Sequence, residues 1–358
     1  MFDSVYKSGL SALILSISFY LACNLVVAEE GAITDQEYDA SGEERIDKRE
    51  FSPYLNDKWI GQGISYGPYR EGESPGGLLP TREELTEDLN LISKHWNLIR
   101  MYGSSEVAED VLKIIHEGKL PLRVMLGAWI ARESESESQT LTASKSAKLS
   151  NRKEVMEVIR LANAYPDEVI AVSVGNETQV DWSDHLTETE LLIRNIRTVR
   201  EATFVPVTTA DDFNFWNKPA SKPVANEIDF IVTHIHPMWA GLEASKAMQW
   251  TEGIYAEIRE YHPEKTIVIG EAGWATQVHI EGEQAKLIKG RAGEEEQRLY
   301  YQSFTDWASE QKICTFFFEA FDEPWKGGPH PNEVEKHWGL FHVNREPKAA
   351  LSPIENSR

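Results

Sequence analysis

From Trp59 onward, short apolar runs alternate with longer segments whose apolar residues recur at helical spacing. Eight of the apolar runs are almost free of charge, which is typical of strands buried on both faces of a parallel sheet. They span residues 59–66, 98–102, 120–129, 169–175, 205–210, 228–236, 266–272 and 313–321. Eight βα repeats within about 290 residues fit a closed barrel better than a doubly wound open sheet. We therefore predict a single (β/α)8 TIM barrel over residues 53–350, followed by a short C-terminal tail at 351–358.

Helix starts and one long polar segment refine this prediction. Thr81 with Glu84, and Thr187 with Glu190, have the spacing of capping boxes and predict two helix N-termini. Residues 131–151 follow the third run and are polar, serine-rich and without period, so we expect a loop there. In a (β/α)8 barrel such a loop lies on the C-terminal face, where active sites are found. A solvated insertion without function is the default interpretation of this loop.

The N-terminal region is typical of an exported protein. One acid and one base precede an uncharged run that ends at Ala28, so residues 1–28 predict an export signal cleaved after Ala28. Cys23 leaves open lipidation as an outer-membrane lipoprotein, and the length of the run leaves open an uncleaved anchor. Residues 29–52 are acidic and poor in apolar residues, which predicts a flexible spacer. The expected location is periplasmic or extracellular.

The two cysteines and the net charge limit the disulfides and the partners that this protein can have. If Cys23 leaves with the signal, Cys314 has no partner for an intramolecular disulfide, and its apolar run predicts a buried, inert thiol. With 41% hydrophobic residues the chain can bury a sizeable core, which excludes a disordered chain. The formal net charge of −22 disfavours nucleic acid and acidic membranes as partners. We expect a monomer with a neutral substrate, and membrane contact only through an N-terminal lipid or anchor.

Two glutamates stand at the ends of predicted strands. Glu177 follows the fourth run by two residues and Glu271 lies near the end of the seventh, each with a glycine one or two residues before it. Either one alone could be an ion-paired structural acid. In an eight-stranded ring both side chains would converge over the mouth. Two carboxylates about 5 to 5.5 Å apart form the acid/base and nucleophile pair of a retaining glycosidase. In such a pair one carboxyl must carry a proton while the other stays ionised.

Several motifs resemble those of a known enzyme family. Gly175-Asn176-Glu177 and the segment Gly270-Glu271-Ala272-Gly273-Trp274 resemble the retaining clan A glycoside hydrolases with (β/α)8 barrels. The segments GISYGP at 63–68, FEAFDEPWK at 318–326 and EKHWGLF at 335–341 resemble glycoside hydrolase family 17, of the bacterial exported β-1,3-glucanase type. The similarity covers roughly residues 59–347 and includes several independent motifs in the right order. The polar insertion at 131–151 has no recognisable counterpart in the family, which leaves endo or exo action open.

The resemblance implies cleavage of β-1,3-glucans such as laminarin, with retention of configuration and without a cofactor or metal. It implies Glu177 as the acid/base and Glu271 as the nucleophile. It also implies that Asn176 holds the sugar 2-hydroxyl and that Tyr66 orients the nucleophile. Two alternatives use the same barrel: a β-1,3-glucanosyltransferase, in which a sugar hydroxyl replaces water, and a catalytically silent glucan-binding protein.

Three further polar residues match the family near its last strand. Glu323, Lys326 and Glu335 correspond to a polar group beside the acid/base. An equally good interpretation is a structural ion network that closes the barrel.

Aromatic and histidine residues complete the candidate site. Sugars present flat apolar faces, and four tryptophans lie at or just after predicted strand ends: Trp129, Trp239, Trp274 and Trp325. Of these, Trp239 and Trp274 are the expected walls of sugar subsites. His234 and His236 lie on one side of the sixth run and could be a metal pair. Because no third ligand stands at a recognisable zinc spacing, we favour hydrogen bonding in the mouth, with His236 contacting the sugar or the nucleophile.

Overall fold

The computed structural model describes residues 47–133 and 141–352, and the backbone alone for residues 141–144. The predicted export signal, most of the predicted spacer and most of the C-terminal tail lie outside the described residues. Among the described helices, none is both long and apolar enough to span a membrane.

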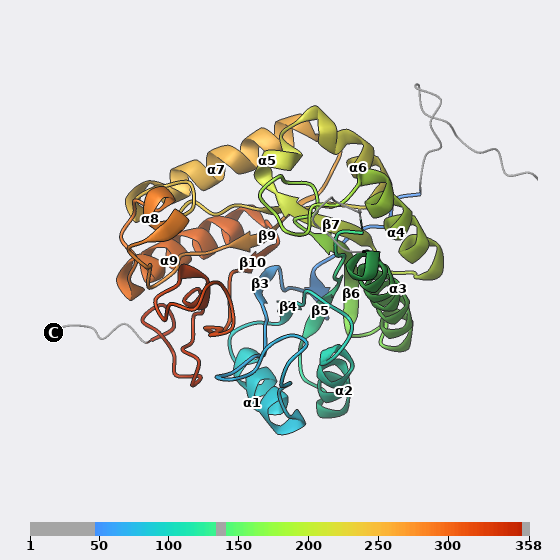
Figure 1. Cartoon of the computed structure of the whole chain (residues 1–358), viewed down its shortest axis with the longest axis horizontal. Coiled ribbons are helices and arrows are strands. Elements are labelled where there is room, and N and C mark those ends of the chain that lie inside the picture. The colour runs from blue at the N-terminus through green and yellow to red at the C-terminus, as the bar shows by residue number, and fades with distance from the viewer. Residues whose placement is uncertain (1–46, 134–140, 353–358) are drawn as a thin grey trace, which may run out of the picture. The chain divides into compact units, whose positions relative to one another are not determined.

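Eight parallel strands form a closed barrel, in which each strand pairs with the next along the chain and the last pairs with the first (Figure 1). The register of the closing pair aligns Phe316 with Gly63 and Phe317 with Ile64. Every predicted apolar run overlaps one of these strands, so the prediction of a single (β/α)8 barrel is confirmed. The strands are β3 (Gln62–Ser65), β4 (Leu98–Arg100), β5 (Arg123–Ala128), β6 (Val169–Asn176), β7 (Val207–Asp212), β8 (Ile231–His234), β9 (Ile267–Ala272) and β10 (Thr315–Phe317).

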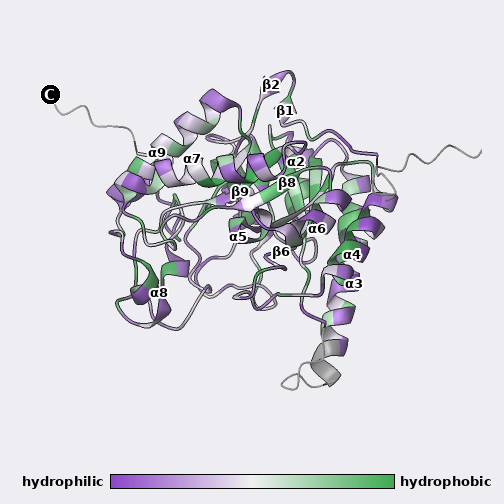
Figure 2. Cartoon of the chain, turned by 90° about the horizontal axis from the view of Figure 1, so that it is seen from above, coloured by the Kyte–Doolittle hydropathy of each residue, from purple (hydrophilic) through white to green (hydrophobic). Residues whose placement is uncertain are grey.

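Helices surround the barrel, and at least one lies between each barrel strand and the next along the chain (Figure 1). In Figure 2, α3 and α4 carry hydrophilic and hydrophobic residues in alternation, as expected of helices with one buried side. The longer helices are α1 (Arg82–Ile92), α2 (Ala108–Gly118), α3 (Leu141–Ala164), α4 (Thr189–Ala202), α7 (Ala244–Tyr261) and α9 (Glu294–Gln311). The short elements are β1 (Tyr54–Leu55), β2 (Lys58–Trp59), α5 (Phe213–Trp216), α6 (Lys222–Glu227) and α8 (Gly282–Leu287), with 3-10 turns at Pro219–Ser221 and Val334–Lys336.

One of the two predicted capping boxes is present. Thr81 caps α1: its hydroxyl accepts from the Glu84 N–H at 3.2 Å, and the Glu84 carboxylate accepts from the Thr81 N–H at 2.7 Å. The box predicted at Thr187 is wrong, because α4 begins at Thr189. The Thr187 N–H donates to the Thr178 carbonyl at 3.0 Å and belongs to the turn after β6.

The loop predicted at residues 131–151 is also partly wrong, because α3 already begins at Leu141. Residues 145–150 of this helix are mostly exposed, so no apolar stripe marks them in the sequence. Asn151 joins the helix to the preceding segment. Its Oδ1 accepts from the Ala131 N–H at 2.7 Å, and its Nδ2 donates to the Ala131 carbonyl at 2.8 Å.

The barrel begins earlier than residue 53. Phe51 is buried and stacks on Phe230 with ring centroids 4.3 Å apart. The Arg49 backbone N–H donates to Asp229 Oδ1 at 2.7 Å. The end of the predicted spacer therefore packs on the N-terminal side of the barrel. Cys314 is a buried free thiol, as expected, and burial raises its pKa well above the ordinary value.

Candidate active site

Glu177 and Glu271 meet at the C-terminal end of the barrel. Glu177 directly follows β6, and Glu271 is the last residue but one of β9. One carboxylate oxygen of Glu177 and one of Glu271 lie within 4.8 Å of each other. This upper limit fits retaining glycosidases, whose carboxyl groups lie roughly 5 to 5.5 Å apart, better than inverting ones, in which they lie roughly 6.5 to 9.5 Å apart.

The backbone before Glu177 departs from regular strand geometry. The pairing of β6 with β7 shifts register between Ser173 and Asn176. Gly175 has φ +83°, where a Cβ atom would be strained and would lie 3.1 Å from Leu192. Glu177 itself has φ +50°, in the left-handed region that few residues other than glycine adopt. An irregularity of this kind re-aims a side chain at a strand end, and here the Glu177 carboxylate reaches His234 across β7.

The Glu271 carboxylate is buried and bonded by three side chains. Its Oε1 accepts from the Arg100 guanidinium at 2.8 Å and from the Tyr102 hydroxyl at 2.9 Å, and its Oε2 lies 3.1 Å from His236 Nε2. Burial alone would raise the pKa of this carboxyl. The nearby His234, His236 and Arg100 instead hold the pKa well below its usual range. Glu271 is therefore built to remain ionised.

Glu177 has fewer partners and more contact with solvent. Its side chain is 29% exposed, against 8% for Glu271. His234 Nδ1 lies 2.8 Å from Glu177 Oε1, and Nε2 of the same ring lies 3.4 Å from Glu271 Oε1. One buried imidazole thus touches both carboxylates. The two carboxylates have the unequal surroundings that divided acid/base and nucleophile roles require.

Arg100 and Tyr102 were not expected from the sequence as site residues. Arg100 is 1% exposed and donates to Asn176 Oδ1 at 2.6 Å as well as to Glu271. It thereby joins the ends of β6 and β9. The sequence did contain a signal for Arg100, which directly follows the apolar residues Leu98 and Ile99 in a predicted strand. A guanidinium buried there needs a partner of opposite charge.

The role expected for Tyr66 is wrong. Its hydroxyl lies 3.3 Å from Asp88 Oδ2 on α1, away from Glu271. Side chains alternate along a strand, and it is Ser65 whose hydroxyl faces the Gly270 carbonyl on β9. Tyr102, which follows the neighbouring strand β4, contacts Glu271 instead.

The two tryptophans expected as subsite walls differ. Trp274 is fully buried, its Nε1 donates to the Arg291 carbonyl at 3.0 Å, and its ring packs near Tyr300, so a subsite wall there is wrong. Trp239 is partly exposed and lines a hollow of about 420 Å³. The hollow is also lined by Glu281, Gly282, Glu283, Gln284, Pro329, Glu333 and the stacked rings of His279 and His330. Trp129 is half-buried against His185, and Trp325 is 40% exposed.

The polar group after β10 is an ion network around Lys326. The ammonium lies 2.6 Å from Glu319 Oε2 and 2.7 Å from Glu323 Oε2. These contacts favour the structural interpretation for Glu323 and Lys326 and add the buried Glu319 to the group. Glu335 makes no such short contact with Lys326. Burial raises the pKa of its carboxyl, and among the charges acting on it are those of Lys326 and Glu271.

The same centre could offer ligands to a metal ion. Among the described residues, Glu177, His234 and Glu271 each present a ligand atom within 4.8 Å of the others. The Arg100 guanidinium, 2.8 Å from Glu271, already supplies the positive charge there and would repel a cation. The donor set therefore fits two carboxylates that are held by neighbouring side chains better than a metal centre.

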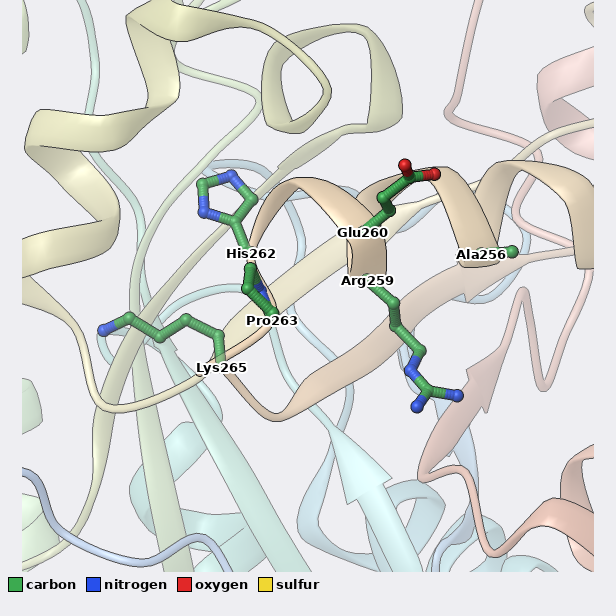
Figure 3. A pocket seen from close by; sticks show the side chains of 6 residues that line it. All are labelled: Ala256, Arg259, Glu260, His262, Pro263 and Lys265. Carbon is green, nitrogen blue, oxygen red and sulfur yellow. The ribbon is translucent and has the colours of Figure 1, made fainter.

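A second hollow, of about 300 Å³, lies at the C-terminal end of α7. In Figure 3 the side chains of Arg259, Glu260 and Lys265 point in different directions. Lys265 Nζ donates to the Ile228 carbonyl at 2.6 Å, and His262 Nε2 lies 2.9 Å from the Trp216 carbonyl. Because this segment precedes β9, the hollow lies on the N-terminal side of the barrel, away from the two glutamates.

Comparison with known proteins gives a consistent picture. A family model described as the BtgE/BtgC glycoside hydrolase domain matches residues 63–339. A glucan 1,3-beta-glucosidase from Arthroderma benhamiae is 26% identical over 301 residues, which cover 80% of this chain and 88% of that protein.

Solved structures share the fold. An endo-laminarinase from Formosa Hel1_33_131 superposes with a TM-score of 0.70 at 25% identity, covering 82% of this chain and 86% of that one. A glycoside hydrolase family 17 beta-1,3-glucanosyltransferase from Rhizomucor miehei has a TM-score of 0.62 at 23% identity, covers 81% and 96%, and supports the fold alone.

Proposed function

The chain belongs to the BtgE/BtgC glycoside hydrolase domain family, and from that premise we propose that it is a retaining hydrolase of β-1,3-glucan. Glu271 is the nucleophile and Glu177 the acid/base. The observation that carries the proposal is the pair of carboxylates within 4.8 Å, of which only Glu271 is bonded to a guanidinium, a phenol and an imidazole.

In the first step a Glu271 oxygen attacks the anomeric carbon and forms an ester bond. The glycosidic C–O bond breaks, and the leaving oxygen takes its proton from Glu177. His234, His236 and Arg100 keep Glu271 ionised, and the bonds from Arg100 and Tyr102 hold its carboxylate in one orientation. Because this geometry exists before the sugar arrives, no reorganisation is needed as charge develops.

In the second step Glu177, now a carboxylate, takes a proton from water. The water oxygen attacks the anomeric carbon from the opposite face, and the bond to Glu271 breaks. Two inversions give net retention. If a sugar hydroxyl takes the place of water, the same step transfers the glycosyl group to a longer glucan.

Asn176 and Arg100 act together at the sugar. Asn176 Oδ1 accepts from Arg100 at 2.6 Å, so its Nδ2 is the atom left to donate to the sugar 2-hydroxyl. The Arg100 guanidinium thereby fixes the orientation of the Asn176 amide, with Oδ1 toward Arg100.

The family relationship and one exposed tryptophan indicate the substrate class. The family and its relatives, among them a glucan 1,3-beta-glucosidase and an endo-laminarinase, point to β-1,3-linked glucan. A partly exposed Trp239 beside a hollow of about 420 Å³ on the C-terminal face offers a platform for a pyranose ring. Laminarin is therefore the substrate of choice. We further propose that the protein acts as an exported monomer, on the basis of its N-terminal sequence and its net charge of −22.

The test is release of reducing sugar from laminarin, with chromatographic analysis of the products. Wild type is compared with Glu177→Gln and Glu271→Gln, and with Asp229→Asn as a control at the other end of the barrel. We expect both glutamine variants to lose about 100-fold or more, since general acid/base catalysis alone contributes about 100- to 10,000-fold.

Each product pattern has its own meaning. Short oligosaccharides indicate endo action, glucose indicates exo action, and chains longer than the substrate indicate transfer. A wild-type protein that binds laminarin without changing the reducing-end count would refute the proposal in favour of a silent glucan-binding barrel.

A further inference from the structure

Asp211 is a buried carboxylate beside Glu177 that the two-step reaction does not use. It is the last residue but one of β7, and none of its surface is exposed. Its Oδ2 accepts the backbone N–H of Gln179 at 2.9 Å, and its Oδ1 accepts the backbone N–H of Asp212 at 2.9 Å. The carboxylate therefore bonds its own strand with one oxygen and the turn after Glu177 with the other.

That turn is the part of the chain that aims Glu177. Glu177 has φ +50°, a conformation that an unsupported residue with a Cβ atom seldom keeps. The Glu177 N–H donates to the Ala210 carbonyl at 2.9 Å, and the Gln179 N–H donates to Asp211. Strand β7 thus holds both ends of the three-residue turn 177–179.

The next residue, Asp212, bonds a different part of the chain. Asp212 Oδ1 accepts the N–H of Asn214 at 2.8 Å and caps α5. Of the two consecutive aspartates, Asp211 is the one that bonds the turn carrying Glu177.

We propose that Asp211 is a positioning residue, which holds the backbone turn that presents the acid/base Glu177. This inference rests on the proposed function. Two fixed N–H donors need two acceptor oxygens, so asparagine cannot replace aspartate without turning an N–H toward one of them. Burial first, and then the charge of Glu177, raise the pKa of the Asp211 carboxyl well above its usual range, which is consistent with their proximity.

Two substrates can show whether Asp211→Asn misplaces the acid Glu177 or weakens the whole structure. Laminaritetraose has a poor leaving group and needs a proton from Glu177. The 2,4-dinitrophenyl β-laminaribioside has a good leaving group that departs without one. We expect Asp211→Asn to lower kcat/KM about 10- to 100-fold for the tetraose, because a misplacement of about 1 Å can cost about 100-fold. For the aryl substrate we expect a fall in kcat/KM of less than about 3-fold, since general acid catalysis is not needed.

A second measurement, kcat with the aryl substrate, reports on the step in which water releases the sugar from Glu271. With the aryl substrate kcat should fall, because Glu177 must also activate water. Azide, which needs no base, should restore kcat and give the β-glycosyl azide.

Asp229→Asn is the matched control. Asp229 is also buried, and its two oxygens also accept backbone N–H groups, from Arg49 and Val207 at 2.7 Å each, but it lies at the N-terminal end of the barrel. This variant should unfold more easily and show no difference between the two substrates.

The outcomes are distinguishable. A wild-type protein that cleaves neither substrate contradicts the proposed function. If wild type cleaves both and Asp211→Asn loses the same factor on both, Asp211 has only a structural role and the inference is overturned. If Asp211→Asn does not fold, Asp211→Ser, which keeps one acceptor oxygen, is measured on the same substrate pair with the same two readings.

Discussion

The guanidinium of Arg100 is the group whose removal should most clearly expose how the site works. It donates to Glu271 Oε1 at 2.8 Å and to Asn176 Oδ1 at 2.6 Å, in surroundings where it is 1% exposed. Arg100→Met keeps most of the length and apolar volume of the side chain and removes both donors. A hydrogen bond to a charged group is worth about 1.5 to 3 kcal/mol. Since about 1.4 kcal/mol is tenfold in rate, loss of the bond to Glu271 should lower kcat/KM about 10- to 150-fold.

The same change should alter the pH dependence, and its sign can be worked out. Burial raises the pKa of Glu271, and the positive charge of Arg100 is one of the influences that bring it down. Without that charge the pKa of Glu271 rises. A nucleophile must be ionised, so the acidic limb of kcat/KM against pH should move to higher pH.

The assay is kcat/KM for laminari-oligosaccharides across pH, for wild type, Arg100→Met and Arg100→Lys. Lysine keeps the charge but cannot bond Glu271 and Asn176 together as the planar guanidinium does. We expect the lysine variant to lose activity with a smaller shift of the acidic limb. A folded Arg100→Met that loses less than about 3-fold in activity and keeps the wild-type acidic limb would refute this role of Arg100.

Further predictions concern the ion network and the tryptophans. Lys326→Met should lower the free energy of unfolding by about 3 to 5 kcal/mol, because it leaves the fully buried Glu319 without its cation. Adding Glu319→Gln should recover part of that loss in denaturant unfolding, and a double variant less stable than the single one would contradict the network. Trp239→Ala should raise KM for long oligosaccharides with little change in thermal unfolding. Trp274→Ala should lower the free energy of unfolding by about 3 to 5 kcal/mol and leave KM of the folded protein unchanged, and a raised KM there would contradict its burial in the core.

The barrel was predictable because its signal is local. Each strand is a short apolar run, and eight such runs in order leave few alternative topologies. The start of α3 was not predictable, because residues 145–150 are mostly exposed and have no buried face to impose a period. The packing of Arg49 and Phe51 on the barrel was not predictable, because it depends on contacts between residues far apart in the sequence. They lie in an acidic segment, and the partners that bury them, Asp229 and Phe230, are far along the chain.

The two glutamates were predictable from strand ends, whereas their supporting residues were not. The topology of the barrel brings the ends of β6 and β9 together whatever the side chains between them. Which tyrosine reaches Glu271 depends on side-chain alternation at the strand end, and this places Tyr102 in the site and Tyr66 against α1. Trp239 and Trp274 look alike in sequence, since each follows a strand closely, and only the packing of Tyr300 and Arg291 around Trp274 separates them.

The central claim is that Glu271 forms a covalent bond to the sugar, and trapping that intermediate tests it most directly. A 2-deoxy-2-fluoro β-laminaribioside with a dinitrophenyl leaving group should form the ester quickly and release it slowly, because fluorine destabilises both oxocarbenium-like transition states. The account predicts that the intact protein gains the mass of one fluoroglycosyl group, and that peptide mapping places it on Glu271. A label on Glu177 or another residue would contradict the assignment, and a protein that hydrolyses laminarin with inversion and takes up no label would contradict the mechanism.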